Sequence, residues 1–480
     1  MVPPAEDLAR IRRVVLEALA GRPLVLVGGS LDFFTPHLHE IRSLGLPTPL
    51  VVTSPGTWGA APADDLYVET QEEIAVDRPG GTVEPDWQRA LAHPAPEVQA
   101  ALDAHDPAHQ AVVMPYFHRK SAAIGDRPFY GQRPDAAAAL EGKPVASRWL
   151  DEIGVSQPGP WTTAPVARFA LEQLFNFYRA TKHEGVIVSG DGRGGVPAGG
   201  RLTFASKFDD ASIDRIIERL GPECDALRVA PFVEGQTIAV HGFVTDHGAA
   251  VFDPVEVMGL RFDPGKFFCA GWNTAYQLDP IRLEQARSAF QRVADGMAHD
   301  FGYRGALTLD MIATERGIVV NDVNPRPGGG FRWVSELAPE LPANLLHYVL
   351  AEGQGTDVHP ETLEAIVADA RAQRSFAQAD LWLDGPPNDA LRALQIDGVN
   401  ITIMQASESS TGLLIDFNNV APGARLSERL LDVAHEISER SGIAVWFNDC
   451  ARERDPVARQ LPRTQALRQR HSQRAALGLV

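Results

Sequence analysis

The sequence predicts an α/β protein whose middle part is of the α+β type. Short apolar runs at residues 23–29, 49–53 and 111–114 alternate with helical periodicity, an arrangement typical of a parallel sheet. A hairpin pattern and a glycine-rich loop follow at residues 305–324 and 191–200. At about 150 residues per domain, the length of 480 residues fits about three domains. We therefore expect an α/β domain over residues 1–120, a central domain over residues 121–355 and a small α/β domain over residues 356–480, with a helix at residues 427–441.

Composition and charge exclude several classes of protein. Hydrophobic residues make up 44% of the chain, which excludes wholesale disorder. The 44 basic residues against 62 acidic residues give a net charge of −18, opposite in sign to a typical nucleic-acid binder. The three cysteines lie far apart and are odd in number, which argues against a disulfide framework. We expect no nucleic-acid partner.

The sequence also shows no membrane or targeting signal. No run of residues approaches the roughly 18 apolar residues that a transmembrane helix needs. Glu6 and Asp7 precede an amphipathic run, unlike the start of a signal peptide. We therefore expect a cytoplasmic protein without a membrane partner.

The most informative segment is the predicted hairpin. Two apolar runs flank Glu315-Arg316-Gly317, which we interpret as a three-residue loop. Counting outward from this loop places Asp310 opposite Asp322, with Asn324 on the same face. Paired carboxylates repel each other, and a divalent cation that prefers oxygen ligands, such as Mg²⁺, would remove the repulsion. The alternative is an exposed hairpin with two unrelated acids, but an Asp within Ala-Leu-Thr-Leu-Asp-Met-Ile is unexpected without a partner.

Asp310 followed by Asp322-Val-Asn-Pro-Arg326 resembles the metal signature of the ATP-grasp superfamily, of the carboxylate–amine ligase type. The resemblance implies that Asp310, Asp322 and Asn324 hold metal against ATP, with two Mg²⁺ ions expected and Mn²⁺ as a substitute. It covers roughly residues 120–350. It implies a Rossmann-like pre-ATP-grasp domain, then a two-lobed ATP-grasp domain, and it leaves the role of the small C-terminal α/β domain open.

A lysine before a helix resembles the entry segment of the family. Lys143 is followed by a helical run and by Gly154-Val-Ser-Gln-Pro, and the resemblance implies that Lys143 contacts an ATP phosphate. A surface lysine at the start of a helix is the alternative. A cation at a helix N-terminus opposes the helix dipole, so an anionic partner would stabilise it.

The glycine-rich loop occupies the place of the family's phosphate-covering loop, with Arg193, Gly194 and Gly195 as the binding candidates. Backbone N–H groups of such a loop can approach phosphates closely. The family usually has a second lysine at the end of the preceding strand, where this chain has Ser189. We favour Arg193 as its substitute, with Lys182 and Lys207 also considered. A linker is the alternative interpretation of the loop.

The run Leu227-Arg-Val-Ala-Pro-Phe-Val-Glu-Gly235 resembles the segment between the two lobes that receives adenine. The resemblance implies that the Pro231 carbonyl and the Val233 N–H bind the base. Glu234 either reaches the ribose hydroxyls or is a solvated turn residue.

Several arginines lie in or beside these motifs. The resemblance places Arg326 near the transferred phosphate or the acyl substrate, and Gly-rich backbone follows it. We assign Arg261 and Arg304 to binding of carboxylate or phosphate, with structural ion pairs as the alternative. Glu256 could bind an amine, but a strand-edge acid is the favoured interpretation.

The predicted function is that of an ATP-dependent carboxylate–amine ligase. It would form an amide or peptide bond through an acyl phosphate and release ADP and phosphate, from small-molecule carboxylate and amine substrates. A carboxylating or purine-type ATP-grasp enzyme is one alternative. A nucleotide-binding module without catalysis is another, and Ser189 is its main support. The sequence is compatible with a homodimer.

Overall fold

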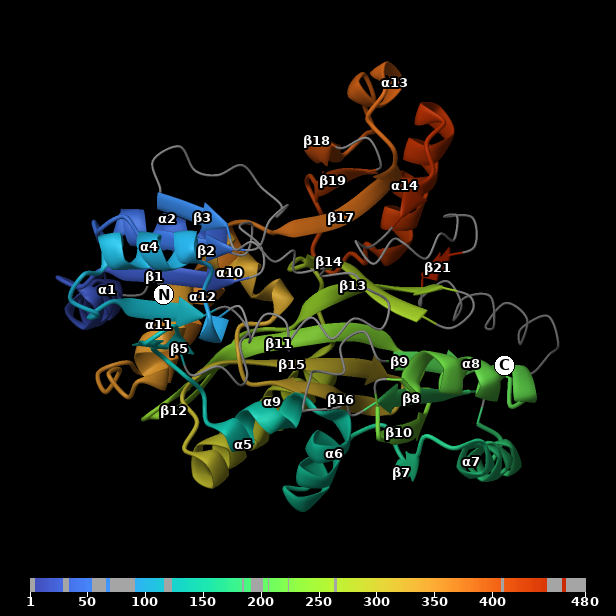
Figure 1. Cartoon of the computed structure of the whole chain (residues 1–480). Helices are drawn as coiled ribbons and strands as arrows, with labels where there is room; N and C mark the ends of the chain where they lie inside the picture. The colour runs from blue at the N-terminus through green and yellow to red at the C-terminus, as the bar shows by residue number, and fades with distance from the viewer. Residues whose placement is uncertain are drawn as a thin grey trace.

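A computed structural model gives the fold, and it describes residues 5–28, 34–53, 66–69, 91–115, 123–183, 185–190, 202–205, 207–222, 224–262, 266–406, 410–446 and 460–462. Within these ranges the chain forms four sheets. Figure 1 shows an N-terminal unit in blue at the left, a small lobe in green at the lower right, and a C-terminal unit in orange and red at the top, arranged around a large central sheet. None of the described helices is long and apolar enough to cross a membrane.

The N-terminal unit is built on a parallel sheet of order β3-β2-β1-β4, which confirms the predicted α/β class. Strand β1 is buried along its whole length, as expected for a parallel strand covered on both faces. The elements are α1 (Ala5–Leu19), β1 (Leu24–Gly28), α2 (Thr35–Ser43), β2 (Leu50–Thr53), β3 (Leu66–Glu69), α4 (Pro96–His105) and β4 (Val112–Pro115).

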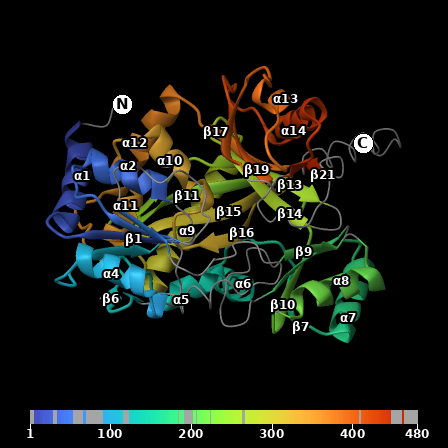
Figure 2. The ribbon, with the colours of Figure 1, turned by 45° about the horizontal axis from the view of Figure 1, so that its top comes forward.

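The two faces of this sheet pack against very different parts of the chain. Val25 and Val27 pack in a small core with α4, while Leu24 and Leu26 pack in a larger core with α1 and α2. That larger core also contains residues from α10 (Arg332–Leu337), α11 (Ala343–Ala351) and α12 (Pro360–Gln373). Figure 2 shows these three helices against the N-terminal unit. Helix α12, which the sequence assigns to the C-terminal unit, therefore packs with the first one.

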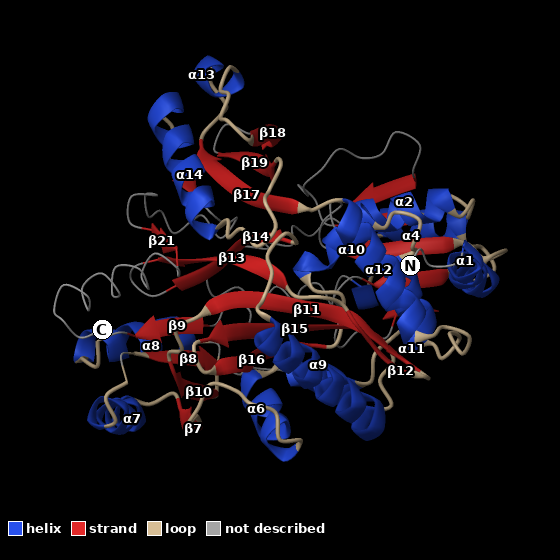
Figure 3. Cartoon of the chain, turned by 180° about the vertical axis from the view of Figure 1, so that it is seen from behind, coloured by secondary structure: helices blue, strands red, loops and turns tan. Residues whose placement is uncertain are grey.

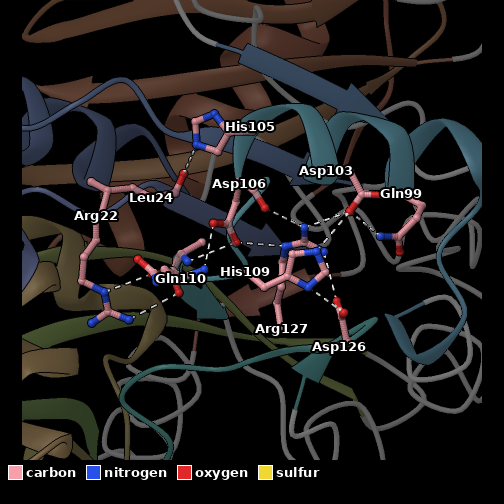
Figure 4. A network of polar contacts seen from close by, with 11 residues as sticks. Arg22, Leu24, Gln99, Asp103, His105, Asp106, His109, Gln110, Asp126 and Arg127 are labelled. Atoms are coloured by element: carbon pink, nitrogen blue, oxygen red, sulfur yellow. Dashed lines mark hydrogen bonds and ion pairs between the residues drawn. The ribbon is translucent and has the colours of Figure 1, made fainter.

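A network of charges lies on the N-terminal unit, away from the shared core (Figure 4). The Arg127 side chain is 1% exposed and forms ion pairs with Asp103, Asp106 and Asp126 at 2.9–3.1 Å. Asp106 is fully buried, and His109 lies 2.7 Å from Asp126. Arg127 therefore faces three opposite charges, and these ion pairs tie the β5–β6 hairpin (β5, Ala123–Ile124; β6, Arg127–Pro128) to the end of α4.

The small lobe is an antiparallel sheet of order β7-β10-β8-β9. One face packs against α7 and α8 through residues such as Val186, Val188, Leu227 and Val229. Its elements, with the helices that lead into it, are α5 (Asp135–Ala138), α6 (Lys143–Glu152), β7 (Thr162–Pro165), α7 (Arg168–Ala180), β8 (Val186–Gly190), β9 (Leu202–Ala205), α8 (Asp210–Leu220) and β10 (Ala226–Pro231).

The largest sheet begins β16-β15-β11-β13-β14, and α9 covers one of its faces (Figure 3). Leu307, Leu309 and Met311 point to that face, so the residues that alternate with them point to the other. The elements are β11 (Gln236–Thr245), β12 (Gly248–Val251), β13 (Val255–Phe262), β14 (Lys266–Asn273), α9 (Pro280–Phe301), β15 (Gly305–Thr314) and β16 (Gly317–Asn324).

The C-terminal unit extends this same sheet, because β17 pairs with the outer edge of β14. Strand β17 was not foreseen from the sequence, whereas the helix predicted at 427–441 is present as α14. The elements are β17 (Ala377–Asp384), α13 (Asp389–Arg392), β18 (Val399–Ala406), β19 (Ser410–Phe417), α14 (Ser427–Ser441), β20 (Val445–Trp446) and β21 (Gln460–Pro462). The boundaries at residues 120 and 355 stay a prediction.

Candidate functional site

The hairpin of β15 and β16 brings the two predicted metal ligands together by a different route from the one expected. Asp310 pairs with Asp322, as predicted. The loop, however, has two residues, since Thr314 pairs with Gly317 and not with Ile318. A β-bulge after Val320 shifts the register by one residue. Val320 faces α9, so strict alternation would point Asp322 at α9 as well, and the bulge turns it to the opposite face.

The hairpin face that points away from α9 carries Asp310 and Asp322, whose negative charges are only partly neutralised. Asp310 is half-buried, and its burial together with the neighbouring charge of Asp322 raises the pKa of Asp310 to about 6. Asn324 lies on the same face and donates from Nδ2 to Asp310 Oδ2 at 3.2 Å. The predicted triad of Asp310, Asp322 and Asn324 therefore converges, and a further positive charge would reduce the repulsion between its two facing carboxylates.

Lys143 reaches this acid pair from the start of α6. The side chain is almost fully buried, and its Nζ lies 2.9 Å from Asp322 Oδ2. Nζ also donates to the carbonyl of Asn321, the bulged residue, at 2.9 Å. The bulge thus frees a backbone oxygen that binds the ammonium group, and the anionic partner expected for a cation at a helix N-terminus is Asp322.

Arg326 is held beside the triad by residues that the sequence analysis missed. Its Nη2 donates to Asn324 Oδ1 at 3.2 Å, and its Nε donates to Glu141 Oε1 at 3.0 Å. Glu141 is buried and also forms an ion pair with Arg133, which in turn donates to the Pro325 carbonyl. An acid two residues before Lys143 was the available signal, but its partner lies 185 residues away in the chain.

A row of polar side chains continues the site across three strands. His241 on β11 pairs with Thr308 on β15, which pairs with Asn324 on β16. Thr308 Oγ1 accepts from the Gly328 N–H at 2.9 Å, donates to the Arg326 carbonyl and lies 3.0 Å from His241 Nδ1. A Cβ on Gly328 would meet the Thr308 side chain at 2.7 Å, so this close contact requires glycine. Thr308 therefore fixes the loop that carries Arg326.

Comparison with solved structures finds this architecture in proteins of low sequence identity. N5-carboxyaminoimidazole synthase from Aspergillus clavatus, in complex with ADP and 5-aminoimidazole ribonucleotide, matches with a TM-score of 0.55 and 13% identity, over 87% of this chain and 99% of that chain. L-amino acid ligase from Bacillus licheniformis matches with a TM-score of 0.54 and 13% identity, over 90% and 100%. The biotin carboxylase domain of Hydrogenobacter thermophilus 2-oxoglutarate carboxylase matches with a TM-score of 0.55 and 13% identity, over 88% and 90%.

The chain has the ATP-grasp fold. The match covers nearly the whole of each of these proteins, so the predicted order of a preceding α/β unit, two lobes and a C-terminal unit is confirmed as a fold. No family model matches the sequence, and the search of curated proteins finds no relative.

The donor set of this ATP-grasp hairpin fits a hard divalent cation. Asp310 and Asp322 supply oxygen ligands, and Asn324 would add its amide oxygen after a half-turn of the amide group, which would break its present hydrogen bonds with Asp310 and Arg326. The described residues hold no group of three or more His, Cys, Asp and Glu side chains placed for a metal. Such a sparse set suits Mg²⁺, which keeps water and substrate oxygens as its other ligands.

The segment predicted to receive adenine lies between the two lobes of the ATP-grasp fold. Strand β10 ends at Pro231, and the next N–H, of Phe232, donates to the Gly185 carbonyl. Val233 and Glu234 are half-buried, and Gly235 is needed because a Cβ there would lie 2.5 Å from the Ala313 carbonyl oxygen. The roles of Pro231, Val233 and Glu234 stay a prediction.

Among the remaining predicted residues, the structure describes the side chain of Arg304, which lies away from the acid pair. Arg304 pairs with Asp246 at 2.7 Å, and it precedes Asp310 by six residues, roughly 20 Å along a strand. The structural ion pair considered as its alternative is therefore the correct interpretation. Arg261 lies in β13 with its side chain outside the described part, and Arg193, Gly194 and Gly195 lie wholly outside the described residues.

Glu256 is not the strand-edge acid that was favoured, because β13 lies between β11 and β14, and its carboxylate binds groups within the chain instead of an amine substrate. It is fully buried, and its carboxylate accepts hydrogen bonds from the backbone N–H groups of Leu426 and Ser427 and from the Ser427 hydroxyl. Asn273 on β14 also donates to it at 2.9 Å. Glu256 therefore caps the N-terminus of α14 and attaches the C-terminal unit to the large sheet.

Proposed function

We propose that the chain is an ATP-dependent carboxylate–amine ligase. The observation that carries the proposal is the facing pair of Asp310 and Asp322, with Lys143 and Arg326 beside it, on an ATP-grasp fold. Two of the structures with this fold hold adenine nucleotide, one as ADP and one as MgADP. ATP and divalent metal are therefore the substrate and cofactor proposed here, with two Mg²⁺ ions favoured and Mn²⁺ as a substitute.

Each group of the site has a proposed task in phosphoryl transfer, which depends chiefly on positioning and charge neutralisation. Asp310, Asp322 and Asn324 would hold the metal, which when bound neutralises charge on the phosphates. Lys143 would bind a phosphate oxygen, because its ammonium already lies within 2.9 Å of a metal ligand. Arg326 would bind the carboxylate or its phosphorylated form through its guanidinium fork, in the orientation that Glu141 and Thr308 impose.

The proposed reaction has two steps. A carboxylate oxygen of the first substrate attacks the γ-phosphorus of ATP, the bond to the β-phosphate breaks, and ADP leaves. The amine of the second substrate then attacks the carbonyl carbon of the acyl phosphate, phosphate leaves, the nitrogen loses a proton and an amide bond forms. Pro231, Val233 and Glu234 would hold the nucleoside, and the loop with Arg193, Gly194 and Gly195 would cover the phosphates.

The proposed partners are small molecules only. Each is a carboxylate or an amine, with no nucleic acid and no membrane, and the proposed location is the cytoplasm. A homodimer is compatible with this proposal, and the biotin carboxylase domain of similar fold was solved as a dimer.

A screen for phosphate release tests the proposal. The full chain with Mg·ATP is offered pairs of amino acids and other small carboxylates and amines, and ADP, phosphate and amide product are measured together. We expect equal amounts of the three products with at least one pair. ADP release that requires bicarbonate in place of every other carboxylate, with label from bicarbonate in the product, would favour the carboxylating alternative, which two of the similar structures represent. Tight binding of Mg·ATP without ADP formation from any pair would favour the non-catalytic module.

A further inference from the structure

Besides Lys143, a second basic side chain near the proposed site is buried: Arg228 in the small lobe, on the sheet face opposite α7 and α8. In β10, Leu227 and Val229 pack against these helices, so Arg228 between them points to the other face. Arg228 pairs directly with Ser189 on β8. The Arg228 side chain is 3% exposed and the Ser189 side chain is fully buried. The two side chains are therefore cross-strand neighbours in an enclosed environment, with Cβ atoms about 4.5–5.5 Å apart.

The guanidinium of Arg228 is oriented by neutral groups. Its Nε donates to Ser147 Oγ at 2.5 Å, and its Nη2 donates to Gln157 Oε1 and to the Pro158 carbonyl, both at 3.4 Å. The Trp161 ring lies 5.8 Å from its Cζ. Within the described part of the chain, Nη1 donates to no acceptor and no carboxylate forms an ion pair with Arg228. Two N–H groups of a fixed fork are thus left for another partner.

Burial of this cation has a cost that the fold alone does not offset. Burial lowers the pKa of Arg228 to about 10, although the negative charge of Asp322 acts in the opposite direction. Charges buried without an ion pair are strongly unfavourable and are rarely retained without a reason. Ser189 adds a second buried polar group that needs a hydrogen bond, because its hydroxyl has no partner among the described residues. An anion that accepts from both groups would satisfy them together.

Helix α6 connects this pair to the metal-ligand hairpin. Lys143 and Ser147 are four residues apart on α6, so their side chains lie on the same helix face. Lys143 binds Asp322 on the large sheet, and Ser147 binds Arg228 on the small lobe. Lys143 and Arg228 therefore lie at the two ends of the space between the acid pair and Ser189. A chain of phosphate groups in that space would meet Lys143 at one end and Arg228 at the other.

We propose that Arg228, with Ser189, is a phosphate-binding pair of the nucleotide site. The Nη1 group of Arg228 and the hydroxyl of Ser189 would donate to oxygens of one phosphate, while Ser147, Gln157 and Trp161 keep the guanidinium in place. This pair rests on the proposed function for its ligand, a nucleoside triphosphate. Arg228 would then take the role of the family's second ATP-binding lysine, for which the sequence had favoured Arg193.

The test compares ligands that differ in their phosphates. Binding of adenosine, AMP, ADP, Mg·ATP, tripolyphosphate and inorganic phosphate is measured by titration calorimetry for the wild type, Arg228→Met, Ser189→Ala and the control Arg168→Met. Arg168 lies on the same lobe in α7, where it pairs with Asp214 at the surface. We expect Arg228→Met to bind Mg·ATP roughly 10- to 100-fold more weakly, as for a lost charged hydrogen bond, and Ser189→Ala roughly 2- to 10-fold more weakly. Adenosine binding and the control should stay at wild-type values.

The pattern of losses identifies the source of the phosphate. If Arg228→Met loses affinity for the nucleotides but binds tripolyphosphate and inorganic phosphate as the wild type does, a nucleotide phosphate lies at Arg228. Equal losses with tripolyphosphate show that the pair recognises polyphosphate without the nucleoside. Wild-type affinity of Arg228→Met for Mg·ATP, or an equal loss for adenosine and Mg·ATP, would overturn the proposal. Phosphate-dependent losses in a chain that forms no ADP would uphold this pair while rejecting the ligase function.

A rescue variant guards against an effect on folding. In Ser189→Lys/Arg228→Met, the lysine on β8 would present its ammonium to the same enclosed space, because positions 189 and 228 are cross-strand neighbours. We expect this double variant to recover most of the Mg·ATP affinity that Arg228→Met loses. Arg228→Lys keeps the charge without the fork and should lose less affinity than Arg228→Met. If Arg228→Met is unstable, failure of both lysine variants to retain any phosphate-dependent binding counts against the proposal.

Discussion

Two buried arginines in this chain have opposite surroundings, and the difference separates structure from binding. Arg127 in the N-terminal unit is 1% exposed and meets three carboxylates (Figure 4). Arg228 in the small lobe is 3% exposed and, in the described part of the chain, meets none. A buried charge whose partners are all present holds elements together. A buried charge with donors to spare is a place for a ligand.

Two acids of the largest sheet, the buried Glu256 and the half-buried Asp310, differ in the same way as the two arginines. Glu256 accepts four hydrogen bonds and fastens α14, so it needs nothing else. Asp310 faces another carboxylate and receives one amide hydrogen bond, so its charge is poorly compensated. The two poorly compensated groups are joined through α6: Asp310 lies on the hairpin that Lys143 of α6 binds, and Arg228 binds Ser147 of the same helix. We therefore place the nucleotide site along α6 and the hairpin.

The largest expected effect separates the two arginines by their influence on stability. We expect Arg127→Met to destabilise the N-terminal unit by about 3–5 kcal/mol, because it leaves the fully buried Asp106 without its cation. Arg228→Met should leave the unfolding midpoint in urea unchanged or raise it slightly, since it removes an unpaired buried charge. Urea unfolding of both variants without ligand, beside the surface control Arg13→Met, measures the difference. Equal destabilisation by both would contradict the contrast.

A second prediction concerns the acid pair. We expect Asp322→Asn to lower ADP release roughly 100- to 1,000-fold while the circular dichroism spectrum and unfolding midpoint stay near wild type. The reason is that the amide removes a metal-binding charge without changing side-chain volume, while the lost ion pair with Lys143 is offset by the relief of the repulsion between Asp322 and Asp310. The matched control is Asp246→Asn, which breaks only the ion pair with Arg304 far along the strand. Near-normal turnover of Asp322→Asn would remove the hairpin from the mechanism.

A third prediction concerns the pH dependence of stability at Glu40, a buried acid that accepts hydrogen bonds and has no ion pair with any described residue. Glu40 accepts from the N–H groups of Asn344 and Leu345 at the start of α11, and burial raises its pKa from its ordinary value of 4.5 to about 7. Between these values the unfolded chain has released the proton and the folded chain keeps it. Stability should therefore fall as pH rises from about 4.5 to about 7, by up to about 3 kcal/mol.

Unfolding of Glu40→Gln across this pH range isolates the contribution of Glu40. The variant should show a flatter dependence than the wild type, whereas the exposed control Glu17→Gln should follow the wild type. Parallel curves for Glu40→Gln and the wild type would show that Glu40 ionises normally in the folded chain.

The smallest expected effect concerns the loop that carries Arg326. Thr308→Val keeps the shape but removes the hydroxyl that binds the Gly328 N–H and the Arg326 carbonyl, so we expect kcat/KM to fall roughly 5- to 30-fold. Because the loop presents Arg326 to the carboxylate, most of the loss should appear in KM for that substrate and little in KM for ATP. The control Thr245→Val removes a hydroxyl from a turn on β11 and should leave both constants unchanged. A loss confined to KM for ATP would contradict this placement of Arg326.

Much of the local structure could be predicted from the sequence. The alternation of apolar runs and helical periodicity predicted the parallel sheet, and the helix at 427–441 was found with those bounds. The facing of Asp310 and Asp322 was also predicted, but through a loop one residue too long whose error the unforeseen bulge cancels. An acid inside an apolar strand indicated a polar partner for Asp310, and the structure places Asp322 opposite it. Arg228, inside Leu-Arg-Val, gave the same signal and was overlooked.

Local periodicity depends on neighbours in sequence, so the sequence by itself determined which segments become strands and helices and which of them carry unusual charges. Only the tertiary structure decided which charges meet. It paired Arg326 with Glu141 across 185 residues and Lys143 with Asp322, and it paired Arg304 with Asp246 far from the acid pair. The physical reason is that an ion pair depends on how elements pack, and a single bulge or an added edge strand changes that packing without leaving a periodic trace.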